Sequence, residues 1–333
     1  MYSISSHCYS YSKPWEQKHV NRILFIVPVY AVASLLSVLY YKHYAYLQII
    51  GDSYSAIAIV SFFALLCHFV APTPEEQDNL FRNIVPIKWS LHIFGIAIPI
   101  PTRCFCSRRV SKPTGTLWFK LISLGVYQYA FVRVLMAVVS LVTQITGRYC
   151  PGSNSPAFAH IWTIVFNSVS AVVAQFFLDQ FFHQISGQLS EHRPNFKFWC
   201  VKCVLIFSQY QTLIVSLLLE LEVLTPAKDV AYPDLKSIPA TLLCIELAIV
   251  SILHLYAFSV ENYRSGAPRK AKLRNCCVAL ADALNPWDFV QAVTRNRRWT
   301  SIGSQAHDKT REQDAIEDPG VIGYVELREL GKA

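Results

Sequence analysis

The sequence predicts an all-α, polytopic membrane protein, a bundle of six transmembrane helices, and two observations support this prediction. Hydrophobic residues make up 53% of the 333 residues, charged residues only 16%, and the mean hydropathy is +0.31. A soluble domain has about 25% charged residues, so a water-soluble enzyme is disfavoured. The apolar residues are also gathered into runs, and about 20 of them in a row are enough to cross a bilayer.

Six apolar runs define the predicted spans. The first two have charge-free stretches at 23–41 and 53–71, and the others hold single polar interruptions such as Arg133 and Asp179. With their flanking residues, the spans are about 23–41, 49–71, 119–146, 161–185, 200–222 and 239–260. The apolar stretch 89–101 is too short to span and ends in prolines, so we expect it to be interfacial or re-entrant.

The distribution of cations predicts the orientation of the bundle. Six spans place both termini on one side, and the connections on that side carry sixteen Lys and Arg residues against four on the other side. Because cytoplasmic connections are enriched in cations, we expect cytoplasmic termini. Residues 1–22 then form a cytoplasmic segment, 23–260 the transmembrane domain and 261–300 a basic cytoplasmic tail, while 301–333 are expected to be disordered.

The tail contains a predicted amphipathic helix over 285–298. Asn285 is suited to be its N-cap and Pro286 its first residue. Trp287, Val290 and Val293 share one face of this helix. We expect it to lie on the membrane surface, with packing under the bundle as the alternative.

Polar side chains at membrane depth are the candidate functional residues. An ionisable group there is costly unless it faces protein or water. Depth along the spans predicts that Arg133 pairs with Glu246, with Asp179 as the next partner. The arrangement is compatible with hydrogen-bonded structural contacts between helices, with a solute or ion path, or with a signalling switch. The candidate residues of this polar layer are Arg133, Gln175, Asp179, His183, Gln211, Glu246 and His254.

Cysteines next to basic residues are candidate S-acylation sites. They form two pairs beside the membrane, Cys104 with Cys106 and Cys276 with Cys277. The sequence holds no GxxxxGK, GxGxxG, HExxH or GxSxG signature, so we predict no enzyme activity, no cofactor and no metal site.

Several motifs resemble one family of membrane proteins. They include Lys13-Pro-Trp-Glu-Gln17, Gln128-Tyr129 ahead of Arg133, Arg193-Pro-Asn-Phe-Lys-Phe198 and Cys244-Ile-Glu246. Together they cover residues 13 to 263 in the family's order. The chain resembles the organic solute transporter alpha-subunit family, which includes the transmembrane protein 184 group.

The resemblance implies a seven-helix protein with a cytoplasmic C-terminus, of which this chain is expected to lack the first helix. Some family members transport bile acids and steroid conjugates, in the best-known case with a single-span beta subunit. We therefore expect facilitated transport of an amphipathic or lipid-like solute in the plasma membrane or a vacuole-like endomembrane. The expected partners are membrane lipids, the organic solute, and a beta-type subunit or a second copy, but no nucleic acid. The alternative is a non-transporting scaffold or signalling protein of an endomembrane.

Overall fold

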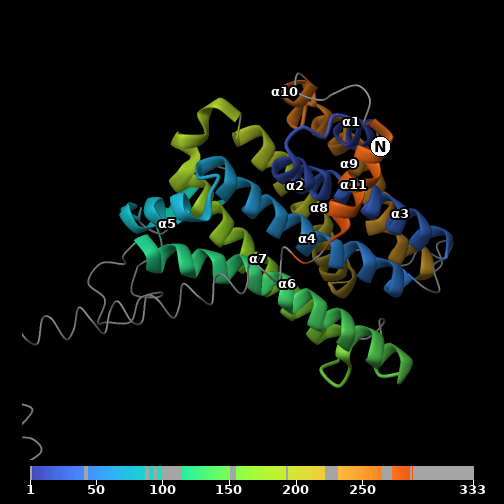
Figure 1. Ribbon diagram of the computed structural model, residues 1–333. Coiled ribbons are helices and arrows are strands. Elements are labelled where there is room, and N and C mark those ends of the chain that lie inside the picture. Colours follow the sequence, from blue (N-terminus) through green and yellow to red (C-terminus); the bar gives the residue numbers. More distant parts are fainter. Residues whose placement is uncertain are drawn as a thin grey trace, which may run out of the picture.

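Long helices dominate the computed structural model (Figure 1). It describes residues 2–40, 44–86, 90–93, 96–99, 115–150, 155–192, 194–221, 232–264, 272–285 and 287. The elements are α1 (Tyr2–Tyr9), α2 (Pro14–Leu24), α3 (Ile26–Leu39), α4 (Tyr44–Val70), α5 (Pro74–Asn83), β1 (Ser90–Ile93), β2 (Ile96–Pro99), α6 (Gly115–Ile145), α7 (Ala159–Ile185), a 3-10 helix (Ser186–His192), α8 (Pro194–Glu220), α9 (Tyr232–Ala257), α10 (Glu261–Arg264) and α11 (Lys272–Leu284).

The predicted polytopic helical bundle is confirmed. Five stretches of the described residues are long and apolar enough to cross a membrane. They are Pro14–Leu39, Tyr46–Val70, Gly115–Ile145, Ala159–Leu189 and Ile238–Ala257. The remaining predicted span, 200–222, corresponds to α8, whose 27 residues extend to about 40 Å, enough for a bilayer core.

The first of these stretches joins α2 and α3 into one continuous rod. The helical backbone hydrogen bonds continue across Phe25. Its N–H donates to the Asn21 carbonyl, and its carbonyl accepts from the Val29 N–H. Since α2 is polar and α3 is apolar, the rod begins outside the predicted membrane region and ends inside it.

Neighbouring helices run antiparallel, so that rising residue numbers on one helix meet falling numbers on the next. Between α4 and α6, Asp52 faces Arg133 and Phe63 faces Phe119. Between α6 and α7, Gln128 bonds to Ser170. The same alternation continues through α8 and α9. We call the end that holds the start of α2, α6 and α8 the inner end and the opposite end the outer end, after the predicted orientation.

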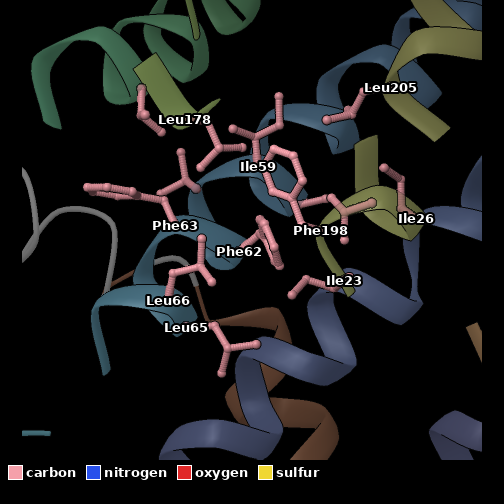
Figure 2. Close-up of a cluster of buried hydrophobic side chains, with 14 of the residues drawn as sticks. Ile23, Ile26, Ile59, Phe62, Phe63, Leu65, Leu66, Leu178, Phe198 and Leu205 are labelled. Atoms are coloured by element: carbon pink, nitrogen blue, oxygen red, sulfur yellow. The ribbon is translucent and has the colours of Figure 1, made fainter. Parts of the chain in front are cut away.

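An apolar core joins α2, α3, α4, α7 and α8 (Figure 2). Phe62 and Phe63 of α4 lie at its centre, and the Phe182 and Phe198 rings stack at 4.1 Å. Lipid chains are as apolar as these side chains, so close packing, rather than escape from water, holds such a core together. Large apolar residues are also exposed, among them Phe131 on α6 and Ile249 on α9, which suits helices that face lipid.

The connection after α4 is ordered by a capping box. The Glu76 N–H donates to Thr73 Oγ1 at 3.2 Å, and the Thr73 N–H donates to Glu76 Oε2 at 3.1 Å, so α5 has a defined start. Its Phe81 ring then stacks on Phe119 of α6 at 3.9 Å. α5 is therefore attached to the inner end of the bundle.

The stretch predicted to be interfacial or re-entrant contains the one pair of strands in the described residues. β1 and β2 pair antiparallel, with Ser90 opposite Pro99. β1 lies against α7. The pair is an addition to the helical architecture, and its depth in a membrane stays a prediction.

The two ends of the described chain form a small unit at the inner end, which we call the terminal module. It consists of α1, α2, residues 257–264 and α11. The sequence did not predict α11. The Asn285 cap is present, because Asn285 Oδ1 accepts from the Trp287 N–H at 3.0 Å. The rest of the predicted 285–298 helix and the predicted disordered segment 301–333 lie outside the described residues.

Candidate functional site

A polar cluster lies inside the bundle, where α3, α4 and α6 meet. Arg133 is 3% exposed, and its Nη1 lies 3.4 Å from Asp52 Oδ2. The other carboxylate oxygen of Asp52 accepts from Tyr30 Oη at 3.3 Å. Tyr129 Oη accepts from Arg133 Nε at 3.0 Å and lies 2.7 Å from Ser55 Oγ. We call these residues the central polar cluster.

Helix geometry explains how the central polar cluster forms. Tyr129 and Arg133 are four residues apart on α6, so they share one face, as do Asp52 and Ser55 on α4. Asp52 is eight residues after Tyr44, about 12 Å inside the outer end of α4. At that depth a carboxylate offsets much of the cost of burying the guanidinium.

The predicted Arg133–Glu246 pair is wrong, and so is the alternative pair with Asp179. Asp52 is the ionic partner of Arg133. Glu246 lies on α9, which contacts α3 and α8, whereas α6 lies against α4 and α7. The depth of a residue along its span gives its position along the membrane normal only. Its partner also depends on which helix packs beside it, here α4.

Asp179 forms a second buried ion pair, with Lys202 of α8. The Lys202 ammonium lies 2.6 Å from Asp179 Oδ2 and 2.8 Å from Oδ1. A cavity of about 10 Å³ lies beside the pair, lined also by Gln175, whose amide nitrogen is buried without a hydrogen-bond partner. This volume is at the lower limit of what one water molecule needs.

The structure separates the other residues of the predicted polar layer. Gln211 reaches Glu246 across α8 and α9, where its amide group can donate to Glu246 Oε2 at 3.0 Å. His254 is buried and meets Phe258 edge-on at 5.6 Å, while His183 is exposed near the inner end. The predicted layer thus divides into three local groups and two separate histidines rather than one continuous set of contacts.

Of the candidate S-acylation sites, the structure describes one side chain. Cys277 is exposed on α11. Cys104 and Cys106, and the side chain of Cys276, lie outside the described residues. Acylation of these cysteines stays a prediction.

The acidic and phenolic partners of Arg133 in the central polar cluster were not predicted from the sequence. Asp52 was inside the predicted span 49–71 but was not considered as a partner for Arg133. The role of Tyr129 could have been predicted from the sequence. A tyrosine one helical turn before a membrane arginine is well placed to accept a hydrogen bond from the guanidinium. Tyr30 and Lys202 carried no comparable signal.

Comparison with known proteins connects this arrangement with a family. A sequence model described as "Organic solute transporter Ostalpha" matches residues 1–263. Transmembrane protein 184 homolog of Dictyostelium discoideum is 30% identical over 266 residues, which cover 78% of this chain and 49% of that protein. Protein LAZ1 homolog 1 of Arabidopsis thaliana is 26% identical over 273 residues, which cover 80% of this chain and 55% of that protein.

The chain thus spans about half the length of these curated relatives. No solved structure matches it. The family match covers most of the chain, and the apolar helices have the length and composition of membrane spans. This chain is an integral membrane protein and belongs to the organic solute transporter Ostalpha family.

Proposed function

We propose that this chain is a transporter, or a subunit of one, that moves an organic amphipathic or lipid-like solute by facilitated transport. The central polar cluster is the observation that carries the proposal. Its arginine, carboxylate and hydroxyl groups lie inside the bundle at membrane depth, which is costly and is typical of solute pathways. Membership of an organic solute transporter family supports the same role and gives no reason to expect an enzyme.

The contacts within the cluster support a proposal for how it acts. Tyr30 and Tyr129 hold the Asp52–Arg133 pair with neutral hydroxyl groups, so a polar group of a solute can exchange with one of these contacts without leaving a charge alone. The Asp179–Lys202 pair lies nearer the inner end, with Gln175 beside it. In this proposal the solute contacts the Asp52–Arg133 pair nearer the outer end and the Asp179–Lys202 pair nearer the inner end.

Flux through proteoliposomes tests this proposal. The full chain is reconstituted and the uptake of a labelled steroid sulfate is measured down its gradient, with and without unlabelled solute inside. We expect uptake above protein-free liposomes that is independent of sodium and proton gradients and is stimulated by internal solute.

The decisive variant is Asp52→Asn with Arg133→Gln, which removes both charges and leaves no unpaired ion. We expect it to fold and to lose about tenfold or more of the flux. Arg148→Gln, an exposed cation at the outer end, is the matched control and should keep the parental flux. Parental flux in the double variant, or no flux from the parent chain, would contradict the proposal.

A second candidate function, a non-transporting scaffold, is favoured by the terminal module. This unit holds α11 at the inner end, where a partner protein in the cytoplasm would meet it. Deleting residues 265–333 separates the two functions. A transporter keeps its flux without the tail, whereas a scaffold loses its partners and never shows flux.

The proposal also covers the partner of the chain and its orientation in the membrane. We propose cytoplasmic termini and either a single-span beta-type subunit or a second copy of the chain as partner. Light scattering of the purified protein tells one copy from two. Labelling of the native Cys150 and of engineered cysteines at Lys228 and Asn195 tests the orientation, with label on position 195 expected only after permeabilisation.

A further inference from the structure

We propose that the inner ends of α2, α4 and α8 form a binding site for the phosphate-bearing headgroup of an anionic membrane lipid. The site consists of Trp15, Lys18, His68, Phe69 and Lys197, which we call the basic aromatic patch. Nothing in the proposed transport function requires it.

Ring contacts bring the patch together from two helices. The Trp15 ring of α2 stacks on the His68 ring of α4, with centroids 5.4 Å apart and planes 16° apart. The Lys18 ammonium lies 4.1 Å from the Trp15 centroid. Trp15 is nevertheless 49% exposed, so the patch has an accessible aromatic surface beside its cations.

Lys197 adds a cation from α8. Its ammonium lies 5.1 Å from the Phe69 centroid, and the side chain is half-buried. No carboxylate of the described residues lies within 4 Å of it, in contrast to Lys202, which Asp179 holds at 2.6 Å. A half-buried ammonium over a ring therefore keeps its capacity to donate to an anionic oxygen.

The nearby acid does not neutralise the patch. Glu16 lies 3.4 Å from Lys13 and 4.0 Å from His68, and it accepts from Tyr263 Oη at 3.0 Å. These contacts are with groups other than Lys197, whose ammonium stays available to an anion.

Position identifies the anion as a lipid rather than a solute in water. Trp15 begins the span Pro14–Leu39, and His68 ends the span Tyr46–Val70, so both lie where a span meets the membrane surface. Phe196 and Trp199, next to Lys197, are 39% and 41% exposed. Aromatic side chains with interspersed cations are typical of the headgroup level of a bilayer.

Lipid binding to the full chain in detergent, measured by native mass spectrometry, tests the proposal. The probes are phosphatidylinositol 4-phosphate and phosphatidylcholine. We expect the parent to bind the anionic lipid in preference, and Lys18→Met with Lys197→Met to weaken that binding about tenfold. Lys197→Arg keeps the charge and should keep the binding, as should the control Arg148→Met at the outer end.

Two further arms keep the test decisive. Lys18→Met alone leaves α8 unchanged, so it reports on binding even if changes at Lys197 disturb folding, and we expect a several-fold loss. Inositol 1,4-bisphosphate, the soluble counterpart of the headgroup, should compete poorly. Equal binding of both lipids, unchanged binding in the two lysine variants, or equally tight binding of the soluble headgroup would each overturn the proposal.

Discussion

Two of the arginines that the structure describes are buried, and they contact different kinds of acceptor. Arg133, in the central polar cluster, is 3% exposed and faces the Asp52 carboxylate. Arg22, in the terminal module, is 1% exposed and donates to the carbonyls of Asp282, Ala283 and Asn285 at 3.0, 2.8 and 2.6 Å. One arginine thus meets a full negative charge and the other meets the end of a helix.

The difference follows from where each arginine lies. The last carbonyls of α11 have no donors within their own helix and carry its partial negative charge, so a guanidinium caps them well. Arg22 makes these contacts at the inner end of the bundle, in the polar part of the first rod. At the depth of Arg133 water does not solvate the guanidinium, so a carboxylate is needed to balance its charge. Arg133 thus meets a carboxylate at membrane depth, whereas Arg22 meets the last carbonyls of α11 at the inner end.

The largest effect that tests this comparison is expected from Asp52→Asn. It leaves Arg133 buried without a counter-charge, and breaking such a pair costs about 3 kcal/mol. Thermal unfolding in detergent should show a clear loss of stability, and Arg133→Gln in the same chain should restore much of it. Glu246→Gln serves as the control and should cost less than about 1 kcal/mol, because Glu246 forms a hydrogen bond with Gln211. A greater loss in Glu246→Gln than in Asp52→Asn would reverse the assignment of the partner.

A smaller and more local effect is expected from Arg22→Gln. The change removes three hydrogen bonds to the end of α11 and should weaken the docking of that helix by about 2 kcal/mol. Limited proteolysis should cut residues 265–285 faster, while the melting of the membrane bundle stays near that of the parent. Tyr11→Phe, which removes one bond to Asp282, should show the same change to a lesser degree. If Arg22→Gln melts the whole bundle instead, the terminal module is not a separate unit.

The smallest effect is a pH dependence of the terminal module, through His7. Burial lowers the pKa of His7 below its ordinary value of 6.5, and the positive charge of Lys197 lowers it further, while the bond between His7 Nε2 and the Phe258 carbonyl opposes this shift. The unfolded form then binds more protons below pH 6.5, so stability falls as the pH decreases through 6.5. The Nδ1 atom of His7 is buried without a partner, which explains why the proton is unfavourable there.

Proteolysis of residues 257–285 measures this effect. Cleavage should be several-fold faster at pH 5 than at pH 7. The same ratio should fall towards one in His7→Gln, which cannot take up the proton. An unchanged ratio in the variant would assign the pH dependence to another group.

Much of the fold followed from the sequence, whereas the contacts of the site did not. Spans could be predicted because each is a local run of apolar residues, and the Asn285 cap because it depends on its own neighbours. The partner of Arg133 depends on which helices lie side by side and on their rotation, which no local pattern encodes. Arg22 shows the same limit, since its charge suggested a loop cation and its contacts lie some 260 residues away.

The close approach of α6 and α7 limits which residue can stand at position 125. A Cβ atom at Gly125 would overlap the Phe177 ring, so the two helices meet there without room for a methyl group. The methyl group of an alanine at position 125 would fit only if the Phe177 ring turned away or the two helices moved apart. The stability of Gly125→Ala therefore measures how closely these two helices must approach in the folded protein.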